Sequence, residues 1–108
     1  MAEPRRPIDA QKVALVDEFL KHGFLGDEVL NTYDFNRSAQ FYRVGAPGGL
    51  RHRVFVSSEF FADHTAGEIE KLLNDWRALE TIKRAGARAV IITNSGISVP
   101  GTKEETTA

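Results

Sequence analysis

The chain has 108 residues, of which 42% are hydrophobic, and 14 basic against 15 acidic residues leave a formal net charge of −1. This length suits one domain with a modest core, and the balanced charge excludes a global field that would draw the protein to nucleic acid or to an anionic membrane. Because the chain contains no cysteine, a disulfide scaffold, a thiolate zinc site and a cysteine nucleophile are all excluded.

The distribution of apolar residues predicts a soluble, cytoplasmic protein. No stretch approaches the roughly 18 apolar residues that a membrane-spanning helix needs. Arg5 and Arg6 near the start are not followed by the apolar segment of a secretory signal. The lack of cysteine also fits a reducing cytoplasm.

We predict a single α+β domain over residues 8–100, between two flexible tails. Residues 1–7 are rich in proline and arginine, and residues 101–108 contain nothing apolar that is larger than alanine. Neither segment can offset the entropy of its ordering by burying side chains.

The first predicted element is a helix over residues 10–22. Asp9 is suited to the N-cap position, and apolar residues follow it at helical spacing. Gly23 followed by Phe24 resembles a Schellman stop, in which a left-handed glycine ends the helix.

Three strands are expected next. Residues 30–35 and 39–44 have strand character and are separated by a polar turn at 36–38. The glycine-rich segment 45–49 predicts a hairpin loop. The returning strand spans residues 50–57, where apolar and polar residues alternate as they do in a strand with one buried face.

The stretch from Thr65 to Gly86 predicts one long amphipathic helix, and Ser57 or Ser58 caps a single helical turn before it. Thr65 and Glu68 fit a capping box, and Gly86 can adopt the left-handed conformation that stops a helix. The apolar stripe consists of Ile69, Leu72, Leu73, Trp76, Leu79 and Ile82.

Residues 89–93 form a short apolar run that is typical of a strand covered on both faces, and after a turn, residues 97–99 can pair back with it. The expected order is therefore approximately α-β-β-β-α-β. Packing the long helix on the strands predicts a two-layer α+β sandwich with a small, mainly antiparallel sheet.

The order of one helix, three strands and a second helix is similar to that of the double-stranded RNA-binding domain. The long predicted helix opens with Thr65, Glu68 and Glu70, however, which is acidic where that family presents lysines to phosphate. We therefore carry no function over from this family.

A surface on the predicted hairpin has the composition of a ligand-binding site. If the even-numbered residues of its two strands face the core, the opposite face carries Phe41, Arg43, Arg51, Arg53 and Phe55. Such a face can hold phosphates with arginine and stack bases on phenylalanine. In the alternative reading, the arginines are solvated or pair with Asp34 or Glu59, and the first helix covers the two phenylalanines. The near-zero net charge favours this alternative.

Catalytic and metal-binding patterns are weaker. Glu59, Asp63 and His64, with a serine nearby, contain the groups of a carboxylate-imidazole-hydroxyl set, but proximity in sequence rarely makes such a set. His22, His52 and His64 lack the spacing of zinc ligands. We predict no metal and no cofactor.

These patterns predict a small, non-enzymatic accessory or protein-interaction module. Its partner is another protein or a second copy of the chain, and Trp76 can anchor a homodimer if part of its ring is exposed. The alternative is binding of single-stranded nucleic acid or another anion through the arginine and phenylalanine face, and an enzyme is the third reading.

Overall fold

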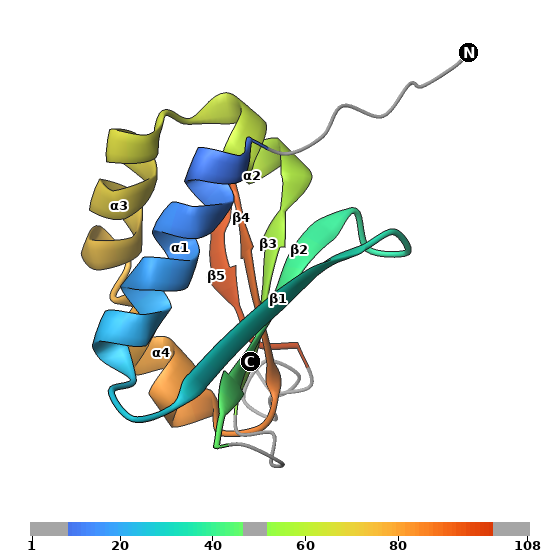
Figure 1. The fold of residues 1–108 in the computed structure, drawn as a ribbon. Helices are drawn as coiled ribbons and strands as arrows, with labels where there is room; N and C mark the ends of the chain where they lie inside the picture. The colour runs from blue at the N-terminus through green and yellow to red at the C-terminus, as the bar shows by residue number, and fades with distance from the viewer. Residues whose placement is uncertain (1–8, 47–51, 101–108) are drawn as a thin grey trace.

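The computed structural model describes residues 9–46 and 52–100, which form an α+β structure with four helices and five strands (Figure 1). The predicted tails, most of the loop at 45–49, Leu50 and Arg51 lie outside the described residues. In chain order the elements are α1 (Ala10–Gly23), β1 (Glu28–Asp34), β2 (Ala39–Gly45), β3 (His52–Ser57), α2 (Ser58–Asp63), α3 (Ala66–Asp75), α4 (Ala78–Ala85), β4 (Ala89–Thr93) and β5 (Gly96–Ser98).

The strands form one sheet in the order β1-β2-β3-β4-β5. Neighbouring strands are antiparallel except for β3 and β4, which are parallel. The predicted mainly antiparallel sheet was therefore wrong, and the sheet is mixed. The reason is the connection between β3 and β4, in which α2, α3 and α4 return the chain to the end where β3 began, so that β4 runs in the same direction.

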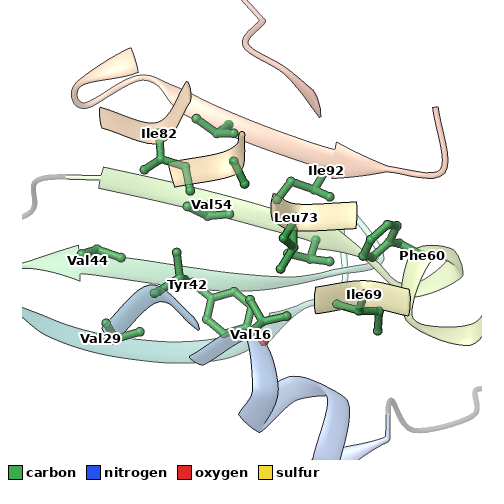
Figure 2. Packing of buried hydrophobic residues seen from close by; sticks show 14 of the residues in the cluster. Val16, Val29, Tyr42, Val44, Val54, Phe60, Ile69, Leu73, Ile82 and Ile92 are labelled. Atoms are coloured by element: carbon green, nitrogen blue, oxygen red, sulfur yellow. The ribbon is translucent and has the colours of Figure 1, made fainter. Parts of the chain in front are cut away.

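The helices α1, α3 and α4 lie together on one side of the sheet, and α2 follows the end of β3 (Figure 1). The core forms between this helical layer and the sheet, where Val16 of α1, Ile69 of α3 and Ile82 of α4 meet Tyr42 and Val54 of the central strands (Figure 2). All five of these residues have an exposed fraction of 1% or less. The hydrophobic contact between the helical layer and one face of the sheet thus holds the fold together.

The single long helix predicted over Thr65–Gly86 was also wrong, because α3 ends at Asp75 and α4 begins at Ala78. Arg77 adopts the left-handed conformation, with φ 56° and ψ 49°. If α3 continued as a straight helix, Glu80 would lie about three turns after Ile69 and would point into the core as Ile69 does. Ile82 would then point away from the core. The break rotates α4 so that Ile82 and Ala78 are buried and Glu80 is exposed.

The local signals at the helix starts are confirmed. Asp9 caps α1 by accepting from the N–H of Gln11, and Ser57 caps α2 by accepting from the N–H of Phe60. Thr65 and Glu68 form the complete capping box at the start of α3.

The two glycines that were expected to stop helices act differently. Gly86 has a φ of +64° and ends α4 as predicted. Gly23 is instead the last residue of α1, and a Cβ atom at this position would collide with the side chain of Leu79. Gly23 therefore leaves room for the side chain of Leu79 against α1, and it does not form the left-handed stop that we predicted.

The strand β4 has one fully covered face, not the two that its apolar sequence predicted. Val90 and Ile92 are buried at 1% exposure, whereas Ala89, Ile91 and Thr93 between them are half-buried. As expected, a short strand, β5, pairs back with β4 in the antiparallel direction.

Candidate binding surface on the open face of the sheet

We call the face of the sheet that points away from α1, α3 and α4 the open face. Tyr42, Val44, Val54 and Val56 point into the core, as the condition for the predicted surface required, and each is completely buried. Because side chains alternate along a strand, the residues between them lie on the open face. No helix of the described residues covers this face (Figure 1).

Pairing between the strands arranges the open face in two rows. In the first row, Phe41 is the partner of Phe55, and Phe55 is the partner of Ile91. In the second row, Arg43 is the partner of Arg53. Four of the five predicted site residues, Phe41, Arg43, Arg53 and Phe55, are thus brought together, and Arg51 lies outside the described residues.

The two phenylalanine rings stack on each other. Their centroids are 4.6 Å apart and their planes differ by 17°. The guanidinium carbon of Arg37 lies 4.6 Å from the centroid of the Phe55 ring, in the geometry of a cation-π contact. Phe55 is consequently only 7% exposed, while Phe41 is half-buried and keeps ring surface that a ligand can reach.

The arginines on this surface differ in their partners. Arg37 lies in the turn between β1 and β2, and its Nε is 3.5 Å from Oδ2 of Asp34. Arg43 and Arg53 are exposed, and within residues 9–46 and 52–100 neither side chain has an ion pair or hydrogen bond.

In the alternative reading, the arginines are solvated and the first helix covers Phe41 and Phe55. The exposure of Arg43 and Arg53 agrees with its first part, but the cover by the first helix is wrong. The first helix packs on the other face of the sheet, where the hydroxyl group of Tyr42 donates to the carbonyl of Val13. Phe41 and Phe55 lie outside the core cluster that α1 helps to form. The only ion pair of a nearby arginine with Asp34, among the described residues, is that of Arg37.

Sequence reasoning missed two members of this surface. Arg37 was interpreted only as a turn residue, because the sequence does not show that the β1–β2 turn folds toward Phe55. Ile91 was expected to be covered, but it is half-buried beside Phe55 on the open face. The described surface is thus an apolar row, Phe41–Phe55–Ile91, with guanidinium groups on both sides of it.

The carboxylate-imidazole-hydroxyl set that we considered from the sequence does not assemble. Ser57 is used as the cap of α2, and the Ser58 hydroxyl donates to the carbonyl of Ser38. His64 instead contacts the amide of Asn94, with 2.9 Å between Nε2 and Oδ1. The same Asn94 donates to Asp63 at 2.7 Å, so this polar group links α2 to the end of β4 without a nucleophile.

The three histidines do not form a metal site, because each has a different hydrogen-bond partner. His22 contacts the Glu18 carbonyl, and buried His52 contacts the Gly86 carbonyl at 3.0 Å. Among residues 9–46 and 52–100, no group of three or more histidine, aspartate or glutamate side chains is arranged to hold a metal ion.

Trp76, the candidate dimer anchor, is half-buried and packs on Phe60, with ring centroids 5.8 Å apart. A groove of about 420 Å³ lies between α1 and the later helices, and apolar residues including Phe19 and Leu79 share its lining with Glu18 and Glu70. None of the helices in the described part of the chain has the length and apolar character needed to cross a bilayer.

Comparisons with protein-family models, with curated proteins and with solved structures found no match to this chain.

Proposed function

We propose that this protein is a small, non-enzymatic interaction module that binds single-stranded nucleic acid on the open face of its sheet. The observation that carries this proposal is the stacked Phe41–Phe55 pair beside two exposed arginines, Arg43 and Arg53, that have no partner in the described structure. The absence of cysteine is compatible with work in the reducing cytoplasm.

The chemistry of the surface fits both parts of a nucleotide. A guanidinium group donates a planar fork of hydrogen bonds to phosphate. Arg43 and Arg53 lie side by side on neighbouring strands, and the backbones of such strands are about 4.8 Å apart. An aromatic ring offers a stacking surface to any base, which favours unpaired bases over a duplex.

The contacts of the two rings assign different roles to them. Phe55 is held between Phe41 and the guanidinium group of Arg37, which leaves little of its ring for a ligand. Phe41 keeps accessible surface, and the Phe55 ring stacks on it. We therefore expect Phe41 to provide the stacking platform and Phe55 to fix its orientation.

The test is fluorescence anisotropy with labelled single strands of about 12 nucleotides, a length within the usual range for a small sheet-based binder. The Arg43→Glu/Arg53→Glu variant should bind much more weakly, and the slope of log K against log salt that remains should be smaller in magnitude by about 1.4, because two phosphate contacts are removed. The matched control is Lys71→Glu/Arg84→Glu, which makes the same change of net charge on exposed positions of α3 and α4. It should bind as the wild-type protein does.

A third variant separates base stacking from simple attraction of anions. Phe41→Ala should weaken binding about tenfold, since one base-aromatic stack contributes about 1–3 kcal/mol. Inorganic polyphosphate should be bound more weakly than the oligonucleotide. If polyphosphate binds equally well and Phe41→Ala has no effect, the surface is a general anion site and the proposal is wrong.

A further inference from the structure

Among the described strands, β1 is an edge of the sheet. It lies at one end of the strand order and pairs only with β2 among the described strands (Figure 1). An edge strand presents unpaired backbone N–H and C=O groups to any strand that can approach it. Proteins often protect such edges with lysine or proline, but the β1 sequence, Glu-Val-Leu-Asn-Thr-Tyr-Asp, contains neither.

Exposed apolar side chains are concentrated along this same edge. Among the described residues, the exposed large hydrophobic side chains are Leu25 at 83%, Leu30 at 51% and Phe35 at 68%. Leu30 lies within β1, Leu25 lies in the turn before it, and Phe35 follows its last residue. A grouping of this kind, next to unpaired backbone groups, is typical of an interaction surface.

We propose that β1 pairs with β1 of a second copy of this chain, antiparallel and around a two-fold axis at Leu30. In this register, Leu30 faces Leu30 of the partner subunit on the open face, and Glu28 faces Thr32 of the partner subunit. A shift that centres the axis on Asn31 would place Glu28 opposite Asp34 of the partner subunit, and opposed like charges destabilise a strand pair. The choice of register therefore follows from the charges at the two ends of β1.

Charge complementarity also favours a second copy as the occupant. Arg43 is the partner of Leu30 in the neighbouring strand, on the same face, and has no counter-charge among the described residues. Glu28 is exposed on that face and is likewise unpaired within residues 9–46 and 52–100. In the dimer, Glu28 of the partner subunit lies opposite Thr32, one row away from the Arg43–Leu30 pair, so it adds a second carboxylate on the side of Arg43 that Glu28 of its own chain does not occupy.

The dimer would be one continuous ten-stranded sheet, twice the five strands of a single copy. Because the proposed pairing keeps open-face residues opposite open-face residues, both Arg43–Arg53 surfaces would lie on the same side. Both proposals use Arg43, but the tests of the dimer contain no nucleic acid and vary Leu30, so a failure of one proposal is distinguishable from a failure of the other.

Sedimentation equilibrium of the full chain, without any ligand, tests the dimer. The wild-type protein should show a concentration-dependent monomer–dimer equilibrium, and Leu30→Lys should weaken the association at least tenfold. Since Leu30 is half-exposed, this variant should fold, which circular dichroism would check. Ser98→Lys is the matched control, because Ser98 is an exposed residue of the opposite edge strand, β5; its dissociation constant should equal that of the wild-type protein.

A second measurement tests the register, and it uses the natural lack of cysteine. Leu30→Cys should be joined into a covalent dimer by a short thiol cross-linker, since directly opposed Cβ atoms are about 5 Å apart. Ser98→Cys should not be cross-linked under the same treatment. A protein that is monomeric at all concentrations, or a dimer that is unaffected by Leu30→Lys, would overturn the proposal.

Discussion

Replacing Tyr42 by phenylalanine tests how β2 is held to α1. The Tyr42 ring is fully buried, and its hydroxyl group donates to the carbonyl of Val13 at 2.9 Å. The carbonyl of Val13 keeps its helical partner when the hydroxyl group is removed, so no buried group loses all its hydrogen bonds. At neutral pH we expect Tyr42→Phe to lower the free energy of unfolding by about 1 kcal/mol, the typical contribution of one hydrogen bond.

The same substitution should have the opposite effect at alkaline pH. Burial, and secondarily the negative charge of Asp17, raises the pKa of Tyr42 far above its ordinary value. The folded protein therefore favours the neutral phenol, whereas in the unfolded chain tyrosine ionises near pH 10. The stability that this adds is complete below about pH 10 and is lost as the pH rises, by about 1.4 kcal/mol per pH unit.

Urea unfolding of both proteins at pH 7, 10 and 11 measures these effects. At pH 11, ionisation of Tyr42 in the unfolded chain should have lowered the free energy of unfolding of the wild-type protein by about 1.4 kcal/mol. The phenylalanine variant has no phenol at this position and cannot lose this contribution. The deficit of the variant should therefore disappear or reverse between pH 7 and pH 11. A deficit that stays constant over this range would show that Tyr42 is not held neutral by the fold.

Three further changes test the helical layer by urea unfolding. Gly23→Ala should destabilise the protein by about 0.5–1.5 kcal/mol, the cost of moving the half-buried Leu79 side chain off its rotamer, and in a Leu79→Ala background the same substitution should have no such cost. Thr65→Ala should cost about 1 kcal/mol, because its hydroxyl group accepts from the N–H of Glu68 at 3.2 Å; an unchanged stability would contradict a role for the capping box. Arg77→Gly should stabilise the protein by up to about 1 kcal/mol by relieving the left-handed conformation, and a loss of stability would show that the Arg77 side chain matters more than its backbone.

Local chemistry was sufficient to predict the starts of α1, α2 and α3 and most of the strands. The N-caps at Asp9 and Ser57 and the capping box at Thr65 depend on residues within three positions of each other, so the sequence contains the whole signal. In β2 and β3, alternate side chains point into the core and onto the open face, and this pattern also depends only on residues that are close in the sequence.

The features that sequence reasoning missed depend on packing between distant elements. The break before Ala78 has no glycine or proline to mark it, and only the sheet below α4 requires Ile82 to turn inward. The parallel direction of β4 follows from the path of three intervening helices. The position of Arg37 over Phe55 likewise brings a turn against a strand 18 residues later.

The candidate surface was predicted in composition but not in its internal contacts. Period-two alternation placed Phe41, Arg43, Arg53 and Phe55 on one face, which the register confirms. The alternation could not show that the Phe55 ring contacts Arg37 and Phe41, because these contacts depend on side-chain packing.

The most direct test of the proposed function is an amide-resolved NMR titration of the full chain with short single-stranded RNA and DNA, at low and then at higher salt. We expect salt-sensitive shifts at Phe41, Arg43 and Arg53, with the amides of α3 and α4 unchanged. If no amide moves at high ligand concentration, or if the shifts cluster on the helical layer, the open face is not a nucleic-acid-binding surface.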